Sequence, residues 1–103
     1  MRYDVRITEP AEEDLRDIFR YISRVLLEPQ IAQKTIATLK KSILALSDMP
    51  QGRPLVADDR LSSMGYRKLI VKNYIVFFTV DEREKMVYVE RVLYGRRDWV
   101  CIL

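Results

Sequence analysis

At 103 residues the chain is long enough for one hydrophobic core, and we predict a single domain over residues 1–103. Hydrophobic residues make up 49% of the sequence and charged residues 32%, a balance that excludes an intrinsically disordered protein. The formal net charge of +3 is uneven: residues 1–50 hold eight basic and eight acidic side chains, and residues 51–103 hold ten and seven. The surplus favours an anionic partner, either nucleic acid or an acidic protein surface.

Several absences narrow the chemistry further. The chain has no His, which excludes imidazole acid–base catalysis and His-ligated metal sites, and no glycine-rich phosphate loop. We therefore predict neither a metal nor a cofactor. Cys101 is the only cysteine, so no internal disulfide can form, and we interpret it as a packed apolar residue. No signal peptide or apolar run of about 20 residues is present, so we expect a cytoplasmic protein without membrane contact.

The first half of the chain predicts one strand and two helices. Residues 2–7 alternate polar and apolar side chains, which indicates a half-buried strand. Thr8 is placed to cap a helix that begins at Glu9 and ends before Pro29. A second helix is predicted over about residues 30–46, antiparallel to the first because the connection is short. We attribute the acidic residues of the first turns to the helix dipole. The predicted core stripes are Ala11, Leu15, Ile18, Phe19, Ile22 and Leu26, then Ala32, Ile36, Leu39, Ile43 and Leu46.

The second half predicts a loop and three strands. Residues 53–65 look irregular, and so long a loop is expected to be functional or mobile. Strands are predicted at about 66–72, 74–80 and 86–94, and the apolar phase slips at Arg91. The slip indicates either two partly covered faces or a bulge near Arg91. Residues 98–103 are expected to form a short final helical turn.

The predicted fold class is therefore α+β. A small, mostly antiparallel sheet carries a two-helix hairpin on one face and leaves the other open, in the order β-α-α-β-β-β followed by a short C-terminal helical turn.

Basic and aromatic residues alternate along the last third of the chain. They are Arg67, Lys68, Lys72, Arg91, Arg96 and Arg97, with Tyr66, Tyr74, Tyr88, Tyr94 and Trp99. Guanidinium groups match phosphate geometry and aromatic faces stack on bases, but a solvated strand surface has the same composition. Gly95 permits a bend at the strand end, after which Arg97 either contacts a ligand or pairs with Asp98.

Three segments in this order resemble the RelE/ParE superfamily of bacterial toxins, the toxin halves of type II toxin–antitoxin pairs. They are Ile7 to Leu15 followed by Ile18 and Tyr21, then Tyr74 to Phe78, and Arg91 to Asp98. The resemblance covers nearly the whole chain. It implies the fold predicted above, a growth-inhibiting function and neutralisation by a cognate antitoxin.

The resemblance leaves two targets open. RelE-like members cut mRNA on the ribosome, and this would make Arg67, Lys68 and Arg97 catalytic in a metal-independent endoribonuclease. ParE-like members poison DNA gyrase instead. Leu69 and Ile75 stand where RelE-like members carry cations, and no tyrosine follows Tyr94. We therefore favour gyrase, with the ribosome-dependent nuclease as alternative and an inactive antitoxin-binding repressor subunit as a second. For target contact we predict Lys72, Arg91, Tyr94, Arg96 and Trp99.

The resemblance also implies how the antitoxin binds. We expect a segment that folds on binding, wraps the helical hairpin and reaches the sheet. Apolar residues near the junction of the helices are the predicted contacts, namely Val25, Leu27 and Ile31. Operator DNA is expected to be bound only through the antitoxin.

Overall fold

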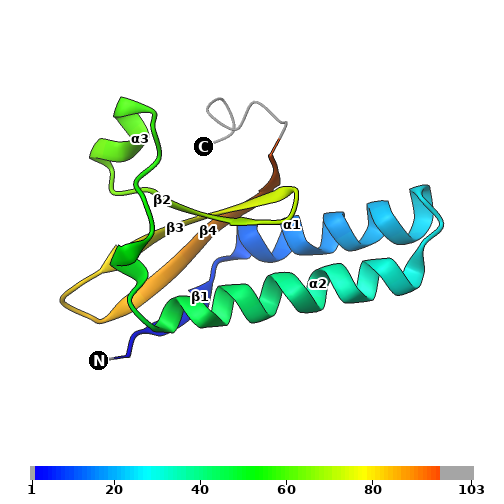
Figure 1. Cartoon of the computed structure of the whole chain (residues 1–103), viewed down its shortest axis with the longest axis horizontal. Coiled ribbons are helices and arrows are strands. Elements are labelled where there is room, and N and C mark those ends of the chain that lie inside the picture. Colours follow the sequence, from blue (N-terminus) through cyan, green and yellow to red (C-terminus); the bar gives the residue numbers. More distant parts are fainter. Residues whose placement is uncertain (1, 96–103) are drawn as a thin grey trace.

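Two long helices lie on one face of a four-stranded sheet in the computed structural model, which describes residues 2–95 (Figure 1). The strands are β1 (Asp4–Ile7), β2 (Arg67–Val71), β3 (Tyr74–Asp81) and β4 (Met86–Tyr94), in the order β1-β4-β3-β2. Only β1 and β4 are parallel among these pairs. The helices are α1 (Glu9–Arg20), α2 (Pro29–Leu44) and the short α3 (Asp59–Ser63). The predicted fold class is confirmed, while the predicted helical turn over residues 98–103 lies outside the described range.

The helical hairpin differs from the prediction at its far end. The Thr8 side chain caps α1 by accepting from the Ala11 N–H, as predicted. After α1 the chain forms one turn of π-helix, Tyr21–Val25, and α2 begins at Pro29. The wider turn shifts the helical phase, so Ile22 stays buried while Leu26, a predicted core residue, is exposed. No helix within residues 2–95 is long and apolar enough to cross a membrane.

The main core lies between the helices and the sheet. Most residues of the two predicted stripes are buried there, although Phe19 is also partly exposed. The helices contribute Ala11, Leu15, Leu39, Ile43 and Leu46, and the sheet contributes Leu69, Val71, Val76, Phe78, Val87, Val89 and Val92.

A β-bulge explains the slip in the apolar phase of β4. Phe78 lies opposite Val89 and Phe77 lies opposite Arg91, so Glu90 is the extra residue. The bulge brings Val92 onto the helix-covered face with Val89 and sends Leu93 to the other face. Both alternatives predicted for this strand therefore hold, since the second face is partly covered as well.

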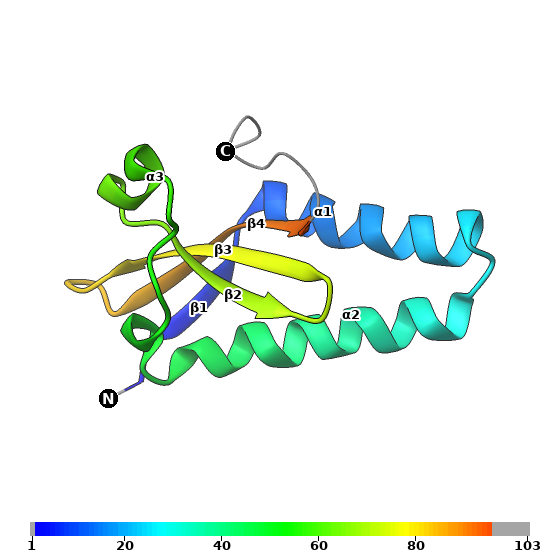
Figure 2. The ribbon, with the colours of Figure 1, turned by 45° about the horizontal axis from the view of Figure 1, so that its top comes forward.

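The cover on that second face is residues 53–66, which we call the strap. Val56 and Leu61 of the strap pack against Phe77 and Leu93, and all four side chains are buried. Figure 2 shows α3, the helical part of the strap, on the side of the sheet away from α2. Asp58 caps α3 by accepting from the Leu61 N–H at 3.0 Å. The segment predicted to be irregular contains the short helix α3. The prediction that this face is open is wrong for its centre, because apolar residues of the strap bury it.

A single buried carboxylate joins α1 to the edge of β4. β1 pairs with β4 only as far as Ile7 and Val89, and Thr8 continues the contact by donating its hydroxyl to the Val89 carbonyl at 2.7 Å. Beyond Val89, where β4 has no neighbouring strand on this side, the carboxylate of Asp14 accepts the hydrogen bonds instead. Its Oδ2 accepts from the backbone N–H of Val92 at 2.9 Å and from Nε of Arg91 at 2.7 Å, and its Oδ1 accepts from Nη2 of Arg91 at 2.9 Å.

This contact corrects the interpretation of Asp14 as a partner of the helix dipole. The residue lies on the buried side of α1 and is 7% exposed. It satisfies a backbone donor that would otherwise lose its partner at a strand edge, and charge-assisted bonds of this kind are among the stronger ones in proteins.

Replacing Asp14 by Ala should lower the free energy of unfolding by about 3 kcal/mol, since it leaves the Val92 N–H and the Arg91 guanidinium without their acceptor. Asp17→Ala is the matched control, because Asp17 pairs with Arg20 on the exposed side of the same helix. It should cost less than about 0.5 kcal/mol. Urea denaturation measures the free energy of unfolding of both variants. Equal losses would show that the buried contact stabilises the fold no more than the exposed ion pair does.

The strap makes a second stability prediction. Leu61→Ala should cost about 2–4 kcal/mol, because Leu61 is fully buried against the sheet. Met64→Ala, at an exposed position one turn later, should change stability by less than about 0.5 kcal/mol. If the strap is mobile in solution, as the length of the loop suggests, Leu61→Ala will cost as little as the control.

Candidate functional site

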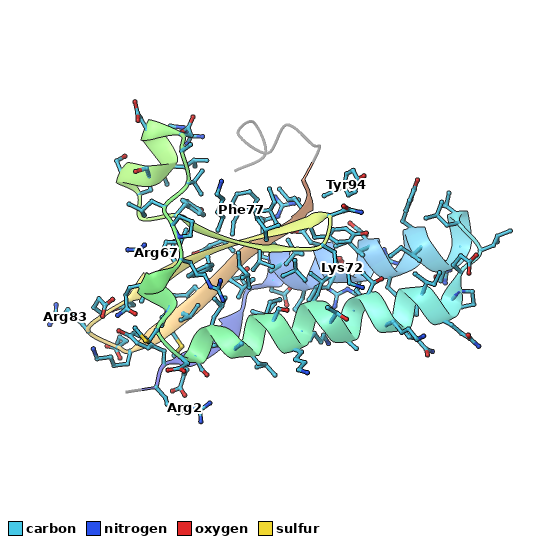
Figure 3. The ribbon with its side chains drawn as sticks, viewed as in Figure 1. Arg2, Arg67, Lys72, Phe77, Arg83 and Tyr94 are labelled. Atoms are coloured by element: carbon cyan, nitrogen blue, oxygen red, sulfur yellow. The ribbon has the colours of Figure 1, made fainter. Side chains whose placement is uncertain are left out.

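The predicted basic residues do not form one cluster. Figure 3 places Arg67 and Lys72 at opposite ends of β2. Arg67 lies opposite Phe78, on the helix-covered side of the sheet, and its guanidinium donates to the Arg53 carbonyl at 2.7 Å. Lys68 lies opposite Phe77 and therefore on the other face. Arg67 and Lys68 therefore do not share a face of the sheet, because neighbouring residues of a strand point to opposite sides.

The remaining cations are engaged or lie outside the described range. The two bonds to Asp14 occupy the Arg91 guanidinium, and this hydrogen bonding raises the pKa of Arg91. Arg91 therefore stabilises the contact between α1 and β4. Arg96, Arg97 and Trp99 follow the last described residue, so their predicted roles stay predictions.

The strap-covered face has an apolar centre with a polar margin. Phe77 and Leu93 occupy the centre. At the margin, Thr79 donates its hydroxyl to Oε2 of Glu90 at 2.9 Å. The pKa of Tyr66 is raised by burial and by the nearby Glu90 carboxylate, so this phenol stays protonated at neutral pH. A carboxylate and a phenol are thus present. Lys68 and Arg91 both lie opposite Phe77, but Asp14 binds the Arg91 guanidinium.

A hollow of about 200 Å³ lies at the end of the sheet beside the β2–β3 turn. Its residues are Ile70, Lys72, Asn73, Tyr74, Ile75, Tyr94 and Gly95. The rings of Tyr74 and Tyr94 meet edge to face, with centroids 5.8 Å apart. Burial raises the pKa of Tyr74, and the neighbouring Tyr94 and Tyr21 raise it further. The predicted contact residues Lys72 and Tyr94 both line this hollow and lie at the same end of the sheet (Figure 3).

The junction of the two long helices carries exposed apolar side chains. Val25, Leu27 and Ile31, the predicted antitoxin contacts, are all exposed, with Leu26 and Tyr21 beside them in the chain. Leu27 adopts a left-handed backbone conformation (φ +57°), which is costly for a leucine, and 76% of its surface is exposed. We call Val25, Leu26, Leu27 and Ile31 the hairpin tip.

The sequence carries a signal for the ion pair between Asp14 and Arg91 that the prediction did not use. Asp14 falls on the apolar stripe of the first helix, between Ala11 and Ile18, and Arg91 falls in the apolar phase of the last strand. Opposite charges at two core-facing positions predict an ion pair. Ile70 and Ile75 gave no such signal, because their contribution to the hollow depends on the pairing of β2 with β3.

Comparison with known proteins agrees with this architecture. The family model described as the ParE toxin of the type II toxin–antitoxin system, parDE, matches residues 5–99. No curated protein matches the chain. Among solved structures, the chromosomal ParDE system from P. aeruginosa is similar, with a TM-score of 0.74 and 19% identity over 90% of this chain and 96% of that chain.

Two further structures share the fold. The toxin–antitoxin complex RelBE2 from Mycobacterium tuberculosis has a TM-score of 0.66 and 20% identity, and it covers 91% of this chain and 99% of that one. A mutant of the E. coli toxin RelE in the free state has a TM-score of 0.68 and 16% identity, with coverages of 99% and 93%. At these identities the structures show a common fold. The family model spans almost the entire sequence, and the chain therefore belongs to the ParE toxin family and is the toxin of a type II toxin–antitoxin system.

Proposed function

We propose that this toxin inhibits growth by binding a protein target, DNA gyrase. The observation that carries the proposal is the apolar centre of the sheet face opposite the helices. Phe77 and Leu93 lie there under the strap, so buried apolar side chains, and not charged ones, fill the centre of this face.

The chemistry of RNA cleavage supports this choice. Cleavage through a 2′-hydroxyl needs a base, an acid and cations that stabilise the charge on the phosphorus centre. Lys68 lies on the correct face, but Arg67 points to the opposite side and Arg91 is bound to Asp14. One lysine among the described strand residues is a sparse set for this reaction, whereas binding to a protein requires no such set.

Purified toxin should inhibit DNA supercoiling by purified gyrase and increase the amount of DNA cleaved by the enzyme. Lys68→Ala should retain inhibition within about twofold, because a protein-binding toxin does not need this lysine for proton transfer. Agarose gels of relaxed plasmid, run with and without denaturation of the enzyme, measure both effects.

The wild-type toxin and Lys68→Ala also distinguish the two alternatives, a ribosome-dependent nuclease and an inactive antitoxin-binding subunit. Codon-phased mRNA cuts by the wild type on translating ribosomes, lost in Lys68→Ala, would replace gyrase by the ribosome as the target. A wild-type protein that leaves growth, supercoiling and mRNA unchanged after induction without its antitoxin would support a subunit that only binds the antitoxin.

We further propose that a cognate antitoxin binds the hairpin tip. Two of the solved structures that share the fold are of toxin–antitoxin complexes. On this chain the tip exposes aliphatic side chains and holds Leu27 in a strained conformation, a combination that a bound partner would stabilise. The tip projects beyond the end of the sheet, as Figure 1 shows, so a wrapping segment can reach it from several sides.

The triple variant Val25→Ala, Leu27→Ala and Ile31→Ala should weaken antitoxin binding at least tenfold, since truncating each apolar side chain should reduce the binding free energy by about 1 kcal/mol. Leu44→Ala is the control, because this exposed leucine lies at the other end of α2. Titration calorimetry gives the affinities and circular dichroism shows that the free toxins stay folded. Unchanged affinity of the triple variant would place the antitoxin elsewhere.

A further inference from the structure

The hollow at the end of the sheet, which we call the tyrosine hollow, holds hydrogen-bond donors without partners. The hydroxyl groups of Tyr74 and Tyr94 and the ammonium group of Lys72 make no hydrogen bond or ion pair with any residue in the described part of the chain. Tyr21 approaches from the helical hairpin closely enough to raise the pKa of Tyr74. Donors from the β2–β3 turn and from the ends of two strands therefore gather at one place.

The backbone around the hollow is held in a defined and partly strained shape. Lys72 adopts a left-handed conformation (φ +54°), which most side chains other than Gly and Asn disfavour. Gly95 donates its N–H to the Asn73 carbonyl at 2.8 Å, and a Cβ at Gly95 would lie 3.3 Å from that oxygen. The backbone of the turn is thus joined to the end of β4.

The lining specifies the chemistry of a ligand. No Asp or Glu is among its residues, and Lys72 with the two phenols offers three donors to an anion. The apolar part of the lining includes Ile70 and Ile75. Ile70 is 64% exposed, which is unusual for an isoleucine on a strand and adds apolar area that a phosphate backbone could not use. An apolar side chain next to a carboxylate fits both parts.

We propose that the tyrosine hollow anchors the target protein, through a target segment that places an apolar side chain beside a carboxylate. This inference rests on the proposed function and names the toxin surface that performs it. Within residues 2–95, the exposed large apolar residues outside the hairpin and its tip are Leu55, Met49, Met64, Ile70 and Tyr94. Ile70 and Tyr94 are the two among these that line a common hollow, and tyrosine is enriched at the energetic centres of protein interfaces.

Two variants test the donors without disturbing the fold. Lys72→Asn removes the charge and keeps a residue that tolerates the left-handed backbone, and Tyr94→Phe removes a hydroxyl while the ring still packs on Tyr74. Lys85→Asn is the matched control, because Lys85 is also left-handed (φ +52°) and lies in the β3–β4 turn at the other end of the sheet.

The readout is the toxin concentration that halves gyrase supercoiling, measured at equal amounts of folded protein. We expect it to rise about tenfold for Lys72→Asn and about threefold to tenfold for Tyr94→Phe, and to stay within twofold for Lys85→Asn. Affinity for the cognate antitoxin, measured in parallel by calorimetry, should stay within twofold for all three.

Each other outcome overturns the assignment. Undiminished inhibition by both hollow variants would exclude the hollow from the target contact. Lost antitoxin affinity with retained inhibition would assign it to the antitoxin, and loss of mRNA cleavage instead would assign it to RNA. If the wild-type toxin leaves gyrase unaffected, the proposed function fails first and this assignment fails with it.

Discussion

The carboxylate of Asp14 holds the two layers of this toxin in register. A strand edge that ends early leaves backbone donors that must find another acceptor, and β1 ends while β4 continues. Asp14 supplies that acceptor from α1 and binds Arg91 at the same time. The position of α1 on the sheet therefore follows from a polar contact as well as from apolar packing. Because the carboxylate is buried, water is not available to accept these hydrogen bonds if the carboxylate is removed.

This arrangement decides which surfaces remain for partners. The helices cover one face of the sheet, and the strap covers the centre of the other with Val56 and Leu61. Among the described residues, two groups of exposed apolar side chains lie at the hairpin tip and at the tyrosine hollow. Because the sheet is covered on one face and at the centre of the other, the proposed binding surfaces lie away from that centre, where Leu27 and Ile70 are exposed.

Under the two binding proposals, these surfaces adjoin at Tyr21. This residue begins the π-helical turn that leads into the tip, and it also lies close to Tyr74 in the hollow. The π-helical turn contributes to this geometry, since its shift of the helical phase turns Leu26 outward while Ile22 remains in the core.

Periodicity in the sequence by itself determined the number, type and order of the main elements and most of the core, because burial of one helix face and one strand face imposes periods of 3.6 and 2. It also predicted the exposure of Val25, Leu27 and Ile31. Only the tertiary structure decided where the charges lie. Whether Arg67 and Lys68 share a surface depends on strand register, and whether Arg91 is free depends on a carboxylate 77 residues earlier in the chain. Such contacts join distant segments, and local patterns carry no information about distances between them.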